Sequence, residues 1–243
     1  MIPTSQAKRI AVVFWLVACL APMLVRADDE PVDIERLRRP LSPQGELRTP
    51  QFEVDVSEVP DDAYSADWAG QARLMCEDWF PVLCRHMACE GWKPPEKVRL
   101  VVKKDMRAPA LRTGSEIHIS QRWIRQHPDD LGMVIHELTH AIQDYPPGQP
   151  GWLVEGIADY IRYWRYEPEL PRPRIDPLKA NYRQGYGTSA AFLAWIVVKH
   201  DRRIILRLDA ALRANRYDAA LFKEGTGKEL DALWEEFLAS QGK

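Results

Sequence analysis

The distribution of apolar and polar residues predicts a few short strands early in the chain and helices after them. Phe52, Val54 and Val56 alternate with polar residues, which is typical of a strand exposed on one side. The segment 97–104 is rich in β-branched residues, and 115–120 alternates cleanly between apolar and polar positions. We therefore expect strands over residues 52–59, 97–104 and 115–120.

Helical spacing of apolar residues begins near Ser65 and dominates the second half of the chain. From Ser65 to Glu90 the large apolar residues recur every three or four positions, and Pro81 either kinks this helix or starts a second one. A small group of strands followed by helices predicts an α+β fold, with a small mixed β-sheet packed on a mainly helical body. Further helices are expected over residues 129–143, 152–166, 187–200, 201–213 and 228–239.

A long connection separates two of these helices. Residues 167–186 contain Pro168, Pro171, Pro173 and Pro177 and show no periodic pattern. Loops of this length in compact domains often form the rim of a functional site. A surface excursion without such a role is the alternative, and the sequence leaves both open.

The N-terminus has the pattern of an export signal. Lys8 and Arg9 precede the almost wholly apolar segment 10–25, and Ala27 ends a tripeptide that fits the small-residue rule for signal peptidase. The apolar segment is short for a membrane span and contains Pro22, so we expect no stable span. Residues 1–27 are therefore predicted to be a signal peptide, and the protein to be secreted or periplasmic.

The same segment allows a second interpretation. Leu16-Val17-Ala18-Cys19 resembles a bacterial lipoprotein box, which would anchor the protein through a lipid on Cys19. In either case, residues 28–50 are polar, contain several prolines and are predicted to be a linker. The folded domain is then expected over residues 51–243.

Charge and cysteine content narrow the class of protein. The formal net charge of the 243 residues is −2, which gives no electrostatic argument for nucleic-acid binding. Cleavage after Ala27 would leave Cys76, Cys84 and Cys89, an odd number for an exported protein. Cys84 and Cys89 could pair across a helix end, although their spacing alone does not show this. No Cys-x-x-Cys occurs, which argues against a zinc ribbon or a redox dithiol.

The residues His136-Glu137-Leu138-Thr139-His140 carry the clearest chemical pattern in the chain. On a helix, positions i and i+4 share a face, so His136 and His140 can bind one metal ion. Glu137 lies beside that face and can reach a water molecule on the same ion. This arrangement is typical of zinc peptidases, in which the glutamate is the general base. Two surface histidines on an ordinary helix are the alternative.

A catalytic zinc site needs a third protein ligand. Zinc peptidases with a third histidine six residues after the motif are excluded, because Pro146 stands at that position. Glu155 and Asp159 lie one turn apart on an otherwise apolar predicted helix, where carboxylates need a cation or hydrogen-bond donors. We predict Glu155 as the third ligand. Asp159 would then accept the outer N–H of a ligand histidine and orient its ring.

These residues give the chain a resemblance to a known family. Glu155-Gly156-x-Ala158-x-Tyr160 after His-Glu-x-x-His is similar to the gluzincin group of zinc peptidases, whose third ligand is a glutamate on the second helix. More closely, the chain resembles the plant basic secretory protein family, zinc peptidases of plants and bacteria, although it is itself mildly acidic. The matching stretches are residues 136–143, 155–160, 185–193 and 227–234.

The resemblance implies a zincin-like metallopeptidase domain and adds two expectations about the site. Gluzincins commonly use a downstream tyrosine to stabilise the oxyanion, which suggests Tyr186, with Tyr182 as the second choice. In zincin folds the strand before the motif helix is the exposed edge that pairs with the substrate. This would be the strand at 115–120, from which His118 could face the cleft.

Together these patterns predict an exported zinc-dependent peptidase that acts on peptides or proteins. Its zinc ligands would be His136, His140 and Glu155, with Glu137 as the base. Two alternatives stay open. The first is a surface binding module that holds zinc without catalysis, and the second is a zinc amidase that acts on a non-protein substrate. No feature of the sequence predicts the oligomeric state or the substrate preference.

Overall fold

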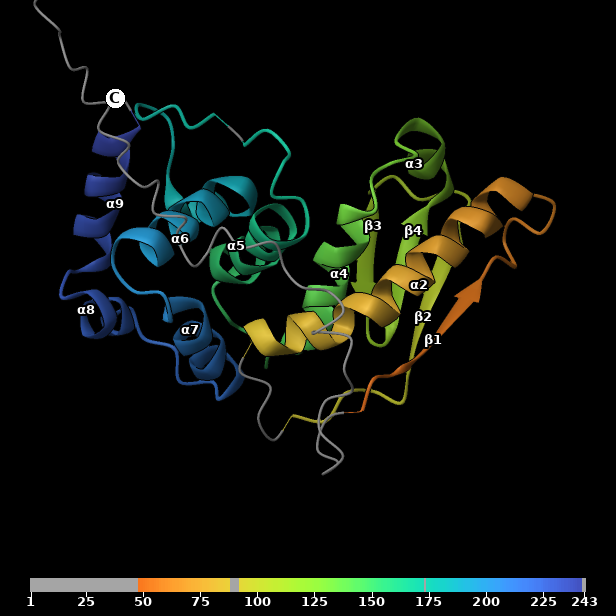
Figure 1. The fold of residues 1–243 in the computed structure, drawn as a ribbon, viewed down its shortest axis with the longest axis horizontal. Helices are drawn as coiled ribbons and strands as arrows, with labels where there is room; N and C mark the ends of the chain where they lie inside the picture. The colour runs from red at the N-terminus through yellow and green to blue at the C-terminus, as the bar shows by residue number, and fades with distance from the viewer. Residues whose placement is uncertain (1–47, 88–91, 173, 242–243) are drawn as a thin grey trace, which may run out of the picture. The chain divides into compact units, whose positions relative to one another are not determined.

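The computed structural model describes residues 48–87, 92–172 and 174–241 (Figure 1). The predicted signal peptide, Cys19, Cys89 and nearly all of the predicted linker lie outside these residues. The pairing of Cys84 with Cys89 and the boundaries before residue 48 therefore stay predictions. No helix in the described ranges combines the length and the apolar character that a membrane span requires.

A mixed four-stranded sheet has the order β1-β2-β4-β3. Strands β1 (Gln51–Asp55), β2 (Lys97–Lys103) and β4 (Glu116–Ser120) are parallel, and β3 (Ala110–Thr113) runs antiparallel to β4 at one edge. In the register of the sheet, Leu100 lies opposite Ile117 and Leu111 lies opposite His118. The small mixed sheet confirms that part of the α+β prediction.

The two faces of the sheet differ in polarity because successive side chains alternate between them. Leu100, Val102 and Ile117 are fully buried, and helices α2 and α4 contact the sheet. The other face carries ion pairs across the strands, such as Lys97 with Glu53 at 2.6 Å and Arg99 with Glu116 at 2.5 Å. Since the second face is charged, the helices pack on the first.

Helix α2 (Ala63–His86) is one continuous element that contains Pro81. Its first turn is capped by Asp62, whose carboxylate accepts hydrogen bonds from the backbone N–H of Ser65 and from Gln121. Proline removes one helical hydrogen bond, but the residues around Pro81 are buried, so tertiary packing maintains the helix. The alternative of a second helix starting at Pro81 is therefore wrong. Cys76 is fully buried on this helix, and burial raises the pKa of its thiol.

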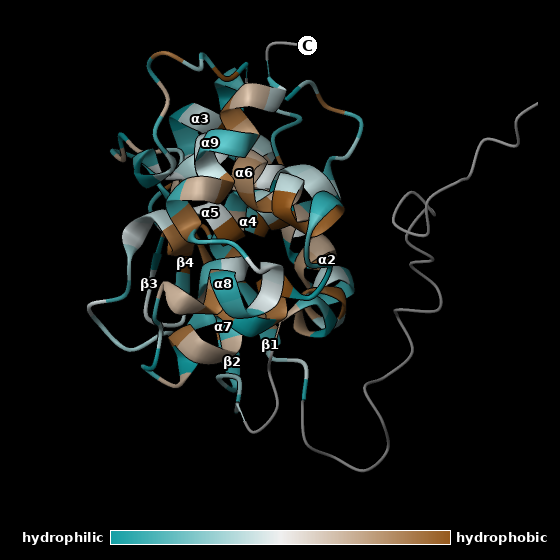
Figure 2. Cartoon of the chain, turned by 90° about the vertical axis from the view of Figure 1, so that its left-hand side faces the viewer, coloured by the Kyte–Doolittle hydropathy of each residue, from teal (hydrophilic) through white to brown (hydrophobic). Residues whose placement is uncertain are grey.

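The remaining helices follow the sheet and form most of the second half of the chain (Figure 1). In Figure 2, α8 and α9 turn hydrophilic residues toward the viewer, whereas hydrophobic stretches gather on α5 and α6 behind them. The elements are α3 (Gln121–Gln126), α4 (Gly132–Gln143), α5 (Gly151–Ile161) with a π-helical turn (Arg162–Tyr166), a 3₁₀ turn (Tyr182–Gln184), α6 (Tyr186–Lys199), α7 (Ile204–Arg213), α8 (Ala220–Thr226) and α9 (Leu230–Ser240).

The sequence pattern missed the shortest elements. Strand β3 and helices α3 and α8 are too short to show a clear period, and β3 exists because it pairs with β4. The first predicted strand was too long. It ends at Asp55, since backbone hydrogen bonds from Val59 to Val56 and from Asp62 to Val59 form a turn there. Helix α7 likewise begins later than predicted, because Asp201 caps the preceding turn through the N–H of Arg203.

Helices α5 and α6 approach closely at Gly156. A Cβ atom built on Gly156 would lie 2.7 Å from Cβ of Ser189 and 3.3 Å from Cδ1 of Leu193, closer than side chains tolerate. Both neighbours are fully buried, so neither has space into which it can move. The glycine therefore sets the distance between the helix that carries Glu155 and the helix that begins at Tyr186.

We expect Gly156→Ala to destabilise the protein although alanine favours helices. Relief of the clash should cost about 1–3 kcal/mol, which exceeds the ~1 kcal/mol gained in helix propensity. The measurement is the free energy of unfolding in urea. Gly70→Ala is the matched control, because a Cβ there meets nothing within 4 Å on helix α2 and should stabilise the protein slightly. Equal effects of the two substitutions would contradict the packing argument.

Candidate metal centre

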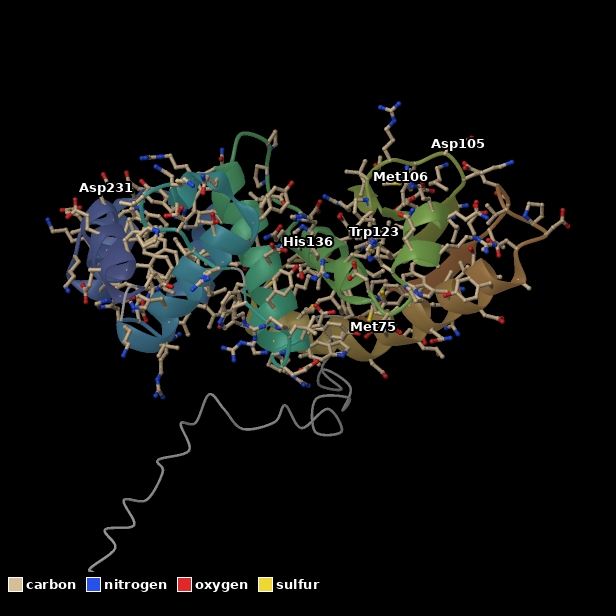
Figure 3. The ribbon with its side chains drawn as sticks, turned by 90° about the horizontal axis from the view of Figure 1, so that it is seen from above. Met75, Asp105, Met106, Trp123, His136 and Asp231 are labelled. Carbon is tan, nitrogen blue, oxygen red and sulfur yellow. The ribbon has the colours of Figure 1, made fainter. Side chains whose placement is uncertain are left out.

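Helix α4 presents the first three predicted site residues. Its residues are almost all buried, because α2, α5 and the sheet surround it. His136 and Glu137 are 8% and 9% exposed, and His140 is somewhat more open. Figure 3 shows His136 where α4 and α5 face each other. The helix ends at Asp144, which has a left-handed conformation (φ 36°) and donates its N–H to the carbonyl of His140. The chain then turns into α5.

The structure brings the three predicted ligands together. Nε2 of His136 lies 3.0 Å from Nε2 of His140, and Oε2 of Glu155 lies 3.2 Å and 3.4 Å from these two atoms. Metal–ligand bonds of about 2.0–2.1 Å in a tetrahedral site place the ligand atoms about 3.3 Å apart. The described residues therefore include a donor triad, His136, His140 and Glu155, whose spacing fits one metal ion.

Hydrogen bonds orient both imidazole rings. Nδ1 of His136 lies 2.7 Å from Oδ1 of Asp159, the partner predicted for it. Nδ1 of His140 lies 2.6 Å from Oε1 of Gln143, whose amide nitrogen donates to the carbonyl of Val154 at 2.9 Å. A carbonyl only accepts, so the amide orientation is determined and Nδ1 of His140 must donate. Both Nε2 atoms then direct lone pairs at the carboxylate of Glu155. Because lone pairs and a carboxylate repel one another, this arrangement requires a cation between them.

The electrostatics of the donor triad favour positive charge. Burial lowers the pKa of His136, but hydrogen bonds to Asp159 and Glu155 outweigh burial and raise it to about 9. Burial raises the pKa of Glu155, yet His136 and His140 lower it to about 2. Without a metal ion, a proton would occupy the space between the two Nε2 atoms and the carboxylate of Glu155. Because a metal ion and the proton need the same lone pairs, they compete for the site.

Glu137 lies beside the donor triad. Its Oε2 accepts the backbone N–H of Arg112 at 2.8 Å. The Arg112 side chain pairs with Asp144 at 2.8 Å and donates to the carbonyl of Gly114 at 2.6 Å, so both ends of this residue tie β3 to the rim of α4. The carboxylate of Glu137 is thus oriented by the sheet and faces the space in front of the donor triad.

The two candidate tyrosines have different surroundings. Tyr186 is 58% exposed, its ring stacks on that of His136 with centroids 6.2 Å apart, and it has a left-handed backbone (φ 47°). Such a conformation is strained in a residue with a side chain and is concentrated at functional sites. Tyr182 is 2% exposed, and its hydroxyl donates to Asp231 at 2.9 Å. Only Tyr186 is placed to contact a ligand at the donor triad.

A cavity of about 1140 Å³ lies in front of the donor triad. Strand β3, helices α4 and α5, the loop 144–150 and the start of α6 surround it. The expectation that the strand at 115–120 forms the exposed edge is wrong, because β4 pairs with β2 and β3 on its two sides. The edge strand that lines the cavity is β3, and His118 is directed to Glu116 at 2.8 Å and does not line the cavity. Among the described residues of the long loop that precedes Tyr186, Gln184 and Gly185 line the cavity.

Two residues with a place in the site had no predicted role. Gln143 lies three positions after His140, and this helical spacing could have suggested it as a partner for the ring. Arg112 contributes its backbone N–H, and a backbone contact has no signature in sequence. Gln143 also joins two helices, since it contacts His140 of α4 and the carbonyl of Val154, the residue before Glu155, on α5.

We expect Gln143→Leu to weaken metal binding by about 10- to 100-fold, because His140 loses the acceptor that orients its ring. Zinc affinity measured by competition with a coloured chelator tests this expectation. Gln143→Glu restores the acceptor for His140 but not the donor to Val154, so it should recover most of the affinity. If both variants lose equal affinity, the role of Gln143 is limited to the packing of α4 on α5.

Comparison with known proteins agrees with these features. No curated protein and no solved structure matches the chain. A family described as "Peptidase of plants and bacteria" matches residues 74–237, about two thirds of the sequence, including the whole donor triad. This finding confirms the family that the motifs predicted. The chain therefore belongs to the family of peptidases of plants and bacteria.

Proposed function

We propose that the protein is an exported, zinc-dependent peptidase. The observation that carries the proposal is the geometry of the donor triad, in which two imidazole nitrogens and one carboxylate oxygen lie 3.0–3.4 Å apart beside Glu137. Two neutral nitrogen ligands and one anionic oxygen ligand form a common catalytic zinc set with one open position. Export rests on the pattern of residues 1–27 alone.

A zinc ion held by His136, His140 and Glu155 would act as a Lewis acid on the scissile carbonyl and would make water acidic enough to react near neutral pH. Glu137 takes the proton of the attacking water and delivers it to the leaving amine. The N–H of Arg112 holds one carboxylate oxygen of Glu137, so the other stays directed at the reaction centre. Asp159 and Gln143 keep the imidazole rings in the required tautomer.

The hydroxyl of Tyr186 donates a hydrogen bond to the oxyanion that forms when water attacks the scissile carbonyl. The negative charge of Glu155 raises the pKa of Tyr186, so the hydroxyl keeps its proton at neutral pH. The residue begins α6 directly after Gly185, which has a positive φ of 77° and lies close to Glu155. A donor directed at developing charge is among the largest contributions to catalysis.

Tyr186→Phe should lower kcat by about 10²- to 10³-fold, the effect of losing one oxyanion donor. Zinc affinity and the melting temperature should stay unchanged, because the ring still stacks on His136. Steady-state kinetics on a fluorogenic peptide measure the loss. Tyr64→Phe is the control, since Tyr64 is 45% exposed on α2 and does not line the cavity. An unchanged kcat would assign the oxyanion to another donor.

The substrate backbone is proposed to lie along β3. Antiparallel pairing with β4 uses the backbone groups of alternate residues, and the N–H of Arg112 points to Glu137, away from β4. The groups of Ala110 have the same orientation as those of Arg112. Because Glu137 already accepts the N–H of Arg112, a bound peptide would add a strand at this edge through the groups of Ala110 and the carbonyl of Arg112, which is a recurring mode of peptide recognition.

A peptide mixture from a denatured protein tests the proposal. The full chain is incubated with it as the zinc form, after chelation, and after zinc is restored, and new peptide ends are identified by mass spectrometry. Cleavage that disappears with the chelator and returns with zinc is expected. If no peptide is cut while zinc removal lowers the melting temperature strongly, the site has a structural role only. If only non-peptide amides are cut, the protein is an amidase.

A further inference from the structure

We infer that the cleft takes an extended chain across the metal centre and that the enzyme cleaves internal peptide bonds. The inference rests on the proposed function and goes beyond it by assigning an endopeptidase. It follows from two properties of the cavity. The cavity extends to both sides of the donor triad, and its charged groups are already engaged by other residues.

The first property is the extent of the cavity along α4. Its lining reaches from Met133, in the first turn of α4, to Asp144, just after the last turn. Twelve residues of helix span about 18 Å, and His136 and His140 are the fifth and ninth of them. An extended chain advances about 3.3 Å per residue, so about five substrate residues fit along this length. Substrate residues would therefore lie on both sides of the scissile bond.

Strand β3 follows the same direction. Ala108 and Pro109, just before β3, line the cavity, whereas Arg112 reaches Glu137 through its backbone and Asp144 through its side chain. Both walls of the cleft thus continue past the donor triad. The volume of about 1140 Å³ exceeds the roughly 300–1,000 Å³ of sites that enclose small ligands.

The second property concerns charge. An enzyme that removes terminal residues needs a carboxylate for the substrate ammonium group or a cation for its terminal carboxylate. Apart from the two histidines, the charged residues lining the cavity within the described ranges are Arg112, Glu137, Asp144, Glu155, Asp159 and Arg162.

Both cationic side chains have acidic partners. Arg112 pairs with Asp144 at 2.8 Å. Arg162 pairs with Asp130 at 2.6 Å and with Glu167 at 3.2 Å, and its side chain is only 17% exposed. A substrate carboxylate at Arg162 would meet two carboxylates that already neutralise the cation, so repulsion would oppose its binding.

The acidic side chains are engaged as well. Asp159 binds His136, Glu155 belongs to the donor triad, and Asp144 pairs with Arg112. Glu137 is the proposed base. None of these four, within the described part of the chain, is left to bind a substrate ammonium group without disturbing the metal centre or the rim.

The polar groups at the far end of the cleft are directed outward. In the loop after α4, the Tyr145 hydroxyl donates to Asp209 at 2.5 Å and the Gln149 amide donates to Asn215 at 2.7 Å. Pro146 and Gly148 between them add no charged group to the lining. This end suits the neutral backbone of a continuing chain, and Met133 at the other end of α4 adds no charge either.

The test compares two halves of one peptide mixture, of about ten residues per peptide or twice the length of the cleft. In one half the termini are free, and in the other they are blocked by acetylation and amidation. The zinc form of the full chain is added to both. We expect the same internal bonds to be cut, with rates within about threefold of each other, because the termini contribute no differential binding.

The outcomes distinguish failure of the inference from failure of the proposed function. Single residues lost from one end of the free peptides, with the blocked peptides intact, would overturn the inference while leaving a zinc peptidase. If neither half is cut by protein that binds zinc, the proposed function fails and the inference fails with it. A length series gives an independent measurement: kcat/KM should rise at least tenfold, about 1.4 kcal/mol, from dipeptide to hexapeptide. A dipeptide cut as fast as a hexapeptide contradicts an extended cleft.

Discussion

Glu137→Gln is expected to reduce peptide hydrolysis by about 10²- to 10⁴-fold, the usual contribution of a general base. Glutamine has the same shape and keeps an oxygen for the N–H of Arg112 at the position that Oε2 now occupies. It cannot take a proton from water. The donor triad does not include Glu137, so zinc affinity should be unchanged.

The measurement pairs single-turnover kinetics with zinc analysis of the purified variant. Glu235→Gln is the matched control, because Glu235 is exposed on α9. Normal activity in Glu137→Gln would show that the proton is taken by another group, and the proposed mechanism would then be wrong. Loss of zinc together with activity would instead show that the substitution disturbs α4.

Glu155→Gln is expected to abolish activity by removing the anionic member of the donor triad. Three donors converge on one point, and Glu155 supplies their only formal negative charge. A neutral amide in its place should lower zinc affinity by more than the roughly 10- to 100-fold seen for residues that only support a ligand. Competition titration with a chelator measures the affinity.

The zinc affinity of Asp159→Asn is the comparison for that of Glu155→Gln. The asparagine oxygen can still accept the N–H of His136, so this variant keeps the three donors and loses only the charge behind them. We expect its zinc affinity to fall less than that of Glu155→Gln. The reverse order would mean that Asp159, and not Glu155, is the third ligand.

Most of the long helices and the donor triad could be predicted from sequence because both depend on spacing. The i, i+4 histidines fall on one face whatever surrounds them, and carboxylates on an apolar helix imply a partner. Glu155 and Asp159 could therefore be assigned, and the structure brings them to His136. Strand β4 was predictable for the same reason, since its residues alternate, and β2 was predictable from its β-branched residues.

What sequence could not show depends on tertiary contacts. Tyr182 and Tyr186 are four residues apart in similar surroundings, and only packing against Trp152, Phe192 and Trp234 buries the first of them. Strand β3 has too few residues for a pattern and is defined by its partner β4. The orientation of Gln143 depends on a carbonyl of another helix.

The contact between Arg112 and Glu137 has a consequence for how this enzyme can change over time. The donor is a main-chain N–H, which every residue except proline possesses. Mutation at position 112 can therefore replace the side chain at the rim of the cleft while Glu137, the proposed base, keeps its hydrogen bond. If the proposed function holds, substitutions at this position are expected to alter which peptides are cut without removing the hydrogen bond of Glu137.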